Sequence, residues 1–412
     1  MEQKKQKKKS NKRKKWIKFR HKIVTAIAFL IMYPICRIKY RIKLEPFCEK
    51  KKRNYLILLN HQTPFDQFFV GMSFKRTLYY VATEDIFSMG WLSSLIRYLV
   101  APIPIKKQTT DLTAVMTCIR VAKEGGSIVI APEGNRTYSG KTEYMSPVIA
   151  SLARKLKLPI ALYRIEGGYG AEPRWSDKVR KGKMRAFVSR VIEPEEYETL
   201  SDNELFRLIE EGLYVNEAIA DVEFKSRRRA EYLDRCIYVC PECGFARFTA
   251  KKNELICDSC QRTVTYHEDK TLSGNGFQLP FTFVNDWYEY QKSYVNGYDP
   301  SRYLDAPVFR DAASLYEVEI YHKKHLLRKT CSVSLYGDRI TVDEAEKDPL
   351  VFPFDEVTTV AVLGRNKANI YINQTVYQLK GDKHFNALKY VNLYYRYQNI
   401  KKGDKNGEFL GL

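Results

Sequence analysis

The sequence predicts an α/β protein, in which a layered domain with a mostly parallel central sheet is followed by a four-cysteine zinc ribbon and a small β-rich domain. Three observations predict this architecture. Short apolar runs alternate with helical patterns up to about residue 217, two CxxC pairs follow, and strand patterns separated by turn residues continue from Leu315 to Leu379. A length of 412 residues agrees with two or three domains.

Residues 1–45 combine a basic tail with an apolar run. Residues 1–22 contain twelve Lys or Arg against the single acid Glu2, in a chain whose net charge is +21. The fourteen residues from Ile23 to Cys36 carry no charge, but a helix needs roughly 20 apolar residues to span a membrane. The run lacks a small-residue cleavage site, so we do not interpret it as a removed signal peptide. We predict an interfacial anchor that binds anionic lipids, with a core helix behind a basic tail as the alternative.

Residues 46–219 form the predicted α/β domain. Its strands are expected at Tyr55–Leu59, Leu78–Val81, Ile103–Ile105, Ser127–Ile130, Pro159–Tyr163 and Met184–Val188. Its helices are expected at Thr109–Glu124, Met145–Lys155 and Asp202–Glu217. Because these strand segments are short and apolar throughout, they indicate a sheet that is covered by helices.

The rest of the chain divides into further predicted parts. The charged segment Glu223–Arg235 is interpreted as a linker helix within residues 220–236, and residues 237–267 are assigned to the zinc ribbon. Residues 268–313 are expected to form a connection with an aromatic helix at Val284–Val295. Six or seven antiparallel strands and a final helix at His384–Tyr397 would make residues 314–400 a pleckstrin-homology-like domain, followed by a tail at residues 401–412.

The segment LLNHQTPFD places His61 just after a buried strand and Asp66 five positions later. If Pro64 starts a helix, Asp66 lies in its first turn and can face back to the imidazole. The carboxylate would then keep one ring nitrogen protonated and leave the other free to accept a proton. A structural histidine satisfied by a nearby acid is the usual alternative for such a pair.

A second strand, in IVIAPEGNRTYSG, also breaks into a polar turn, which offers Glu133, Gly134, Arg136 and Thr137. A guanidinium beside a flexible glycine is suited to a two-pronged grip on phosphate. The alternative is a surface turn with an ordinary salt bridge. Lys106 and Lys107 follow a third short strand and could add positive charge to the same pocket, although paired lysines are more often solvated.

With these segments in this order, the chain resembles the lysophospholipid acyltransferase superfamily, typified by 1-acylglycerol-3-phosphate acyltransferases. NHQTPFD matches the family's H-x4-D block, and PEGNRT, some seventy residues later, matches its E-G-x-R-[ST] block. IPIKK and LPIALY occupy the positions of two further blocks. The resemblance covers about residues 46–217. It departs from the family where Lys106 and Lys107 replace the usual acid and Arg, and where Leu162 replaces a common second proline.

The resemblance implies that His61 is the general base on the acceptor hydroxyl, with Asp66 orienting it. Glu133, Gly134, Arg136, Thr137, Lys106 and Lys107 would bind the acceptor, with Arg136 on its phosphate. The implied donor is acyl-CoA or acyl-carrier protein, and no catalytic cofactor or metal is required. Lysophosphatidate is the expected acceptor, and other lysophospholipids or polar lipids stay open.

The pairs Cys240/Cys243 and Cys257/Cys260 have the spacing of a structural zinc site with four thiolate ligands. Cys236 is a candidate spare ligand, but we expect it to be a bystander. Reduced cysteines without a secretion signal place the protein at the cytoplasmic face of the cell membrane, as a peripheral or monotopic protein. The alternative is a membrane adaptor or a nucleic-acid-binding protein with an inactive acyltransferase-like domain. Residues 240–260 carry equal numbers of acids and bases, so nucleic acid is not expected as a partner.

Overall fold

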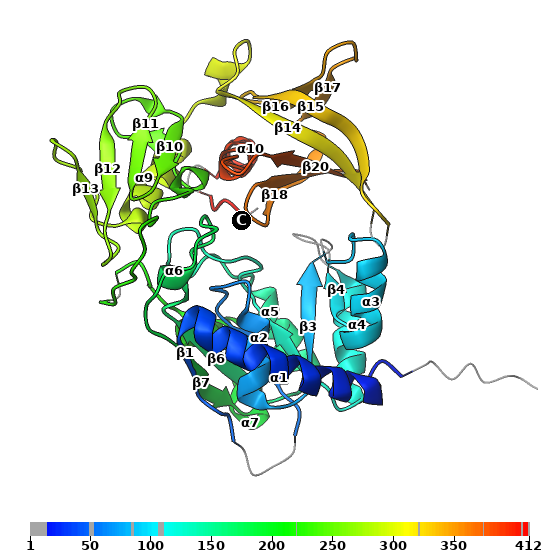
Figure 1. Cartoon of the computed structure of the whole chain (residues 1–412). Helices are drawn as coiled ribbons and strands as arrows, with labels where there is room; N and C mark the ends of the chain where they lie inside the picture. Colours follow the sequence, from blue (N-terminus) through cyan, green and yellow to red (C-terminus); the bar gives the residue numbers. More distant parts are fainter. Residues whose placement is uncertain are drawn as a thin grey trace, which may run out of the picture.

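The computed structural model describes residues 15–48, 53–83, 86–105, 111–219, 221–319, 322–373, 375–404 and 407–410. Figure 1 shows two halves. One half contains a seven-stranded sheet with its helices, and the other contains the remaining strands and the C-terminal helices.

The sheet of the N-terminal half has the strand order β1-β7-β6-β2-β5-β3-β4. The strands are β1 (Ile42–Leu44), β2 (Leu56–Leu59), β3 (Leu78–Thr83), β4 (Ile103–Ile105), β5 (Ser127–Ile130), β6 (Ile160–Glu166) and β7 (Met184–Ile192). Every neighbouring pair is parallel except β6 and β7. The predicted mostly parallel central sheet is confirmed. Strand β2 is buried along its whole length, as its uninterrupted apolar sequence predicts.

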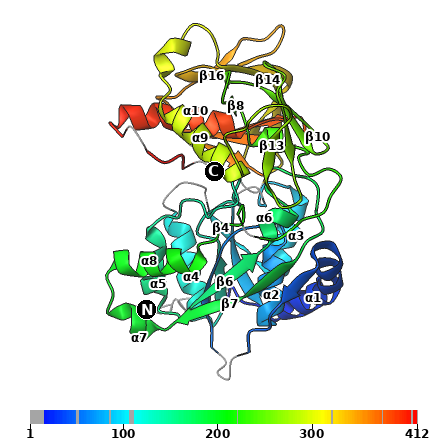
Figure 2. The same ribbon diagram turned by 90° about the vertical axis from the view of Figure 1, so that its left-hand side faces the viewer.

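Helices cover both faces of this sheet (Figure 2). Helices α4 (Leu112–Lys123), α5 (Val148–Leu156) and α8 (Asp202–Leu213) share one core with the sheet. Helices α1 (Phe19–Tyr40) and α2 (Asp66–Phe74) share the core on the opposite face. The short helices α3 (Trp91–Val100), α6 (Gly168–Ala171) and α7 (Pro194–Glu198) were not predicted from the sequence.

Helix α1 has 22 residues, so it extends beyond the fourteen-residue apolar run at both ends. By length and composition it could cross a membrane, and only 11% of its most apolar window is buried in the protein. Figure 1 shows that the helix lies along the N-terminal half rather than projecting from it. One side packs against the protein through Cys36 and Tyr40, while Leu30 and Ile38 are 78% and 81% exposed.

The interpretation of Glu223–Arg235 as a linker helix was wrong. Within these residues only the 3-10 turn η1 (Leu233–Arg235) is helical. The rest of the segment forms hydrogen bonds with distant parts of the chain. Phe224 N–H donates to Glu268 O at 2.8 Å, and Lys225 forms a β-bridge with Lys181. The segment is therefore an extended connection held against both halves of the protein.

The cysteine-containing part of the chain is built from short strands. They are β8 (Val239–Cys240), β9 (Gly244–Phe245), β10 (Phe248–Lys251), β11 (Glu254–Cys257), β12 (Thr263–Tyr266) and β13 (Leu272–Gly274). Strands β10 to β13 form one antiparallel sheet. The predicted aromatic helix is confirmed as α9 (Val284–Asn296), and the 3-10 turn η2 (Pro300–Tyr303) follows it.

The chain ends in a seven-stranded antiparallel sheet with the order β17-β16-β15-β14-β20-β19-β18, against which α10 (Leu388–Lys401) packs. The strands are β14 (Phe309–Val318), β15 (His325–Leu335), β16 (Arg339–Asp343), β17 (Leu350–Pro353), β18 (Val357–Leu363), β19 (Lys367–Ile372) and β20 (Thr375–Gly381). The predicted strand pattern starts at Leu315, but the sheet begins earlier, at Phe309. The small residues Ala312 to Ser314 show no strand pattern, but Ala312 pairs with β15, Ser314 pairs with β20, and Ala313 pairs with both.

The two halves share one hydrophobic core. Tyr138 and Trp175 of the N-terminal half are buried in the same cluster as Leu233, Tyr288 and Leu388 of the C-terminal half. Burial of aromatic side chains contributes several kcal/mol when they are packed in a core. The C-terminal half is therefore packed directly on the loops that follow β5 and β6.

Candidate active site

His61 and Asp66 face each other at the end of β2. Asp66 is the first residue of α2 and is only 1% exposed, and its Oδ2 lies 2.8 Å from His61 Nδ1. The same carboxylate accepts hydrogen bonds from Gln62 N (2.7 Å), Thr63 N (2.9 Å) and Thr63 Oγ1 (2.7 Å). Because the carboxylate only accepts, His61 Nδ1 must carry the proton. The other ring nitrogen, Nε2, is left to accept a proton, and the His61 side chain is 29% exposed.

Two neighbours of His61 that sequence reasoning missed fix this loop. The side chain of Asn60 donates to Ile165 O and accepts from Ile165 N, both at 2.8 Å, which clamps the end of β2 to β6. Gln62 Oε1 accepts from Tyr169 N at 3.1 Å. Both residues stand inside the NHQTPFD segment, but no spacing rule points to their partners about a hundred positions away.

Glu133 braces the loop that carries His61. Its Oε1 accepts from His61 N and its Oε2 accepts from Glu143 N, both at 3.0 Å. Burial raises the pKa of Glu133 to about 8, even though these two N–H donors favour the charged form. The structure thus gives Glu133 a contact that positions the backbone of His61.

Gly134 and Thr137 shape the turn after β5. Gly134 has φ +69°, in the left-handed region that favours glycine. The Thr137 hydroxyl donates to Glu143 Oε1 at 3.1 Å and accepts from Gly140 N at 2.9 Å, and its side chain is buried. The hydroxyl of Thr137 is therefore used within its own loop.

Arg136 follows in the same loop, and one end of its guanidinium is buried. Its Nη1 is buried and has no hydrogen-bond partner among the described residues. Burial lowers the pKa of Arg136 to about 10, helped by the positive charges of Arg365 and Arg174 and opposed by Glu172 and Asp66. The charge of Asp66 acts on both Arg136 and Glu133, so the two predicted motifs share one neighbourhood. A buried guanidinium N–H without an acceptor is rare and calls for an anionic partner.

Lys106 and Lys107 follow β4, which ends at Ile105, and they lie outside the described residues. The sequence therefore stands as the sole basis for their predicted role.

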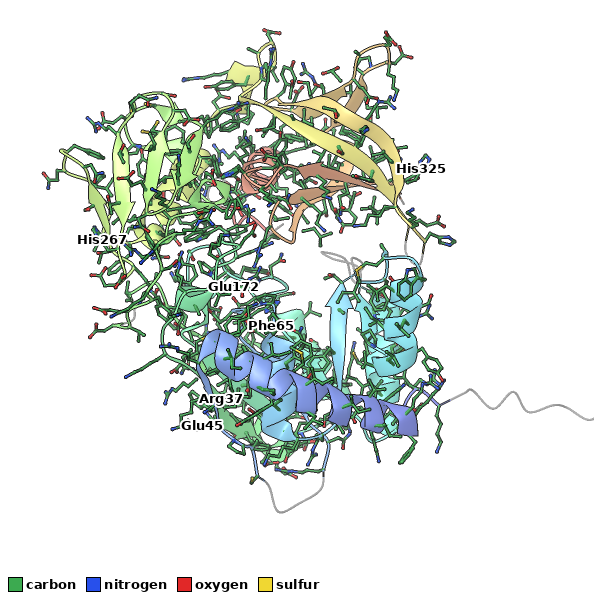
Figure 3. The ribbon with its side chains drawn as sticks, viewed as in Figure 1. Arg37, Glu45, Phe65, Glu172, His267 and His325 are labelled. Carbon is green, nitrogen blue, oxygen red and sulfur yellow. The ribbon has the colours of Figure 1, made fainter. Side chains whose placement is uncertain are left out.

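Glu172 contacts two cationic side chains next to this site. It was not predicted from the sequence. Its Oε1 accepts from Arg365 Nη2, and its Oε2 accepts from the Tyr40 hydroxyl and lies 3.4 Å from Lys39 Nζ. We call these four residues the Glu172 cluster. Lys39 Nζ also stands 4.0 Å from the centre of the Phe65 ring, beside Asp66. Figure 3 shows Glu172 and Phe65 near the C-terminal end of α1, on the side that faces the C-terminal half.

The four cysteines of the CxxC pairs converge. The sulfur atoms of Cys240, Cys243, Cys257 and Cys260 all lie within 4.8 Å of one another. The Sγ atoms of Cys240 and Cys260 are 3.8 Å apart. Tetrahedral zinc with Zn–S bonds of 2.3 Å would separate its sulfurs by about 3.8 Å, so four such thiolates fit a metal ion. Cys236 is buried elsewhere, and its thiol points to Tyr138 O.

The fold and the two loop motifs define the N-terminal half as an acyltransferase domain, and residues 41–164 match the family model described as Acyltransferase. Its NHQTPFD and PEGNRT segments are similar to the two motif blocks of the lysophospholipid acyltransferase superfamily. A 1-acyl-sn-glycerol-3-phosphate acyltransferase of Bacillus subtilis (strain 168) is 22% identical over 172 residues, which are 42% of this chain and 82% of that protein. The crystal structure of the 1-acyl-sn-glycerophosphate (LPA) acyltransferase PlsC from Thermotoga maritima is similar with a TM-score of 0.37 and 21% identity, over 47% of this chain and 75% of that one.

Proposed function

We propose that this protein transfers a fatty acyl chain from acyl-CoA or acyl-carrier protein to the free hydroxyl of a lysophospholipid, converting lysophosphatidate to phosphatidate. One observation carries the proposal. A histidine oriented by a buried carboxylate stands in the same group of loops as Arg136, whose buried Nη1 has no acceptor in the part of the chain that the structure describes. The histidine can remove a proton from a hydroxyl group of the acceptor lipid, and the guanidinium can bind the phosphate of the same lipid.

In the proposed reaction, His61 Nε2 takes the proton of the acceptor hydroxyl as the oxygen attacks the thioester carbonyl. The new C–O ester bond forms, the C–S bond breaks, and the proton from His61 passes to the leaving thiolate. Asp66 stabilises the imidazolium that exists between these two proton transfers. General-base assistance contributes typically ~10²- to 10⁴-fold, and positioning of both substrates supplies much of the rest.

The acceptor is proposed to enter with its phosphate toward Arg136, whose Nη1, without a partner among residues that the structure describes, would donate to a phosphate oxygen. Glu133 holds the backbone of His61 and Thr137 holds the turn, so both act by positioning. Lys106 and Lys107 are proposed to add positive charge at the end of β4.

A membrane face is proposed on α1 and α3. The apolar residues Ile27, Leu30 and Ile38 of α1 are exposed, as are Trp91 and Tyr98 of α3. The two helices are joined because Arg20 Nε donates to Tyr98 O at 2.7 Å and its guanidinium stacks on the Tyr98 ring. An exposed apolar face of this kind, preceded by a basic tail, suits binding in the plane of an anionic leaflet. We place it at the cytoplasmic face of the cell membrane.

We further propose that the four cysteines hold a structural zinc ion, because all four ligand positions are taken by thiolates and none remains for a substrate. The C-terminal antiparallel sheet with α10 is proposed to be pleckstrin-homology-like.

A lysolipid panel with the purified full chain, supplied in turn with labelled acyl-CoA and with labelled acyl-carrier protein, tests the function. Labelled phosphatidate should form from lysophosphatidate with the wild type and should be absent with His61→Ala. If no lysolipid in the panel accepts the label from acyl-CoA or from acyl-carrier protein, the proposed enzyme activity is wrong and the adaptor alternative stands.

A further inference from the structure

We propose that Arg365, from the C-terminal sheet, keeps Arg136 available for the acceptor by holding the competing carboxylate of Glu172. This inference rests on the proposed function of the same site and adds a positioning residue from the other half of the protein. It makes docking of the C-terminal half a condition for binding the acceptor.

Arg136 has two acidic neighbours. Glu172 and Asp66 are the carboxylates whose charges act favourably on Arg136, and Asp66 is committed to His61 and its own loop. Glu172 stands two positions before Arg174, which donates to Arg136 O at 3.0 Å, so Glu172 is the acid positioned to compete with a bound phosphate. An ion pair between Glu172 and Arg136 would neutralise the guanidinium and close the site to an anionic acceptor.

The carboxylate of Glu172 is already bound by other side chains. Arg365 takes Oε1, while Tyr40 and Lys39 share Oε2. Both carboxylate oxygens thus have partners, and Arg136 Nη1 is left with none among the described residues. Because Glu172 is only 4% exposed, water would compete poorly for it if Arg365 were removed.

Arg365 is held in place by a second carboxylate. It lies in the turn between β18 and β19, and its Nη1 also donates to Asp177 Oδ1 at 2.8 Å. Asp177 is held in turn by Arg235, which makes two bonds of 2.8 and 3.0 Å to the two carboxylate oxygens. Arg365 is therefore fixed at the interface between the halves rather than free to leave Glu172.

A separate contact connects β18, the strand that precedes Arg365, to the backbone of Arg136. Arg174 Nη1 donates to Arg136 O at 3.0 Å, and Arg174 Nη2 reaches Val362 O of β18 at 3.5 Å. The end of β18 thus contacts the Arg136 loop through Arg174 and the Glu172 cluster through Arg365. Docking of the C-terminal sheet sets both the position of Arg136 and the absence of a competing acid.

The decisive experiment compares Arg365→Gln with the double variant Arg365→Gln/Glu172→Gln in the full chain. If Glu172 captures Arg136 when Arg365 is lost, the single variant should raise the KM for lysophosphatidate at least about tenfold. The KM for acyl-CoA should not change. The second substitution removes the competing charge and should restore the acceptor KM, and Arg365→Lys should stay near wild type. Arg310→Gln, an exposed arginine on β14, is the matched control.

Two outcomes overturn the inference while the acyltransferase function stands. In one, Arg365→Gln behaves like Arg310→Gln. In the other, its defect is not relieved by Glu172→Gln, which is the result expected if Arg365 only stabilises the interface. Binding of soluble 1-hexanoyl-glycerol 3-phosphate, measured by calorimetry, tests the same point without turnover. Equal affinity for wild type and Arg365→Gln, or no binding to either, also rejects the inference, whereas a wild type that binds the probe but transfers no acyl group rejects the proposed function alone.

Discussion

His61 Nδ1 lies 2.8 Å from Asp66 Oδ2, and this contact joins the loop after β2 to the first residue of α2. Asp66→Asn would place an amide NH2 among three backbone or side-chain donors that now bond to the carboxylate. The His61 tautomer would no longer be fixed. We expect kcat/KM for acyl transfer to fall by ~10² to 10⁴-fold.

His61→Ala is the companion variant for this prediction. It removes the base but leaves the Asp66 bonds to Gln62 and Thr63, so its melting temperature should stay closer to wild type than that of Asp66→Asn. Activity near the wild-type level in a folded His61→Ala protein would eliminate the proposed mechanism.

Arg136 is expected to select acceptors by their phosphate. Arg136→Gln keeps a polar side chain but removes the charge, so the KM for lysophosphatidate should rise by about tenfold or more, with a smaller change in kcat. Arg136→Lys should recover part of this loss, because an ammonium provides charge without two parallel N–H donors. A change confined to the KM of acyl-CoA would assign Arg136 to the donor side instead.

The four-cysteine cluster should hold the C-terminal half together by binding metal. Cys257→Ser removes one of the four thiolates and should lower the zinc content of the purified protein from about one ion per chain toward zero. Limited proteolysis should then cut within residues 237–274 first. Cys236→Ser is the control, since its buried thiol lies apart from the cluster. Equal zinc content in both variants would contradict the proposed ligand set.

The exposed face of α1 should determine membrane binding. Ile27→Glu and Leu30→Glu put charges on a surface that makes few contacts with the rest of the protein, so the fold should survive while vesicle binding drops. Sedimentation with vesicles of anionic phospholipid measures the effect. Leu326→Glu, on an exposed position of β15, supplies the matched control. Unchanged binding by the α1 variants would exclude this helix as the anchor.

The central sheet could be predicted because its strands are short apolar runs, whose local sequence reports burial. His61 and Asp66 could be paired for a similar reason, since five positions separate them and a turn joins them. Glu172 and Arg365 could not be found in this way, because they lie 193 positions apart and each resembles an ordinary surface charge in the sequence. The charged segment Glu223–Arg235 was wrongly predicted to be a helix, because its hydrogen bonds to distant residues cannot be seen in the local sequence.

Glu133 should make stability depend on pH in a predictable direction. Burial, together with the nearby charges of Glu143 and Asp66, raises its pKa from an ordinary 4.5 to about 8 in the folded protein. An acid with a raised folded pKa binds more protons when folded than when unfolded between these two values. Its contribution to stability is therefore fully present below about pH 4.5 and is lost as pH rises toward 8. Glu133→Gln cannot ionise and lacks this loss.

The measurement is the difference in melting temperature between wild type and Glu133→Gln across pH 5 to 8.5. Comparing the two proteins cancels other groups, such as Glu217, whose pKa burial raises to about 7. The variant loses one accepted N–H bond, because its amide NH2 faces a donor, and this cost does not change with pH. The advantage of wild type over the variant should therefore be largest at pH 5 and shrink toward pH 8. A difference that stays constant over this range would show that Glu133 is ionised throughout and that the His61 loop is braced by a charged carboxylate.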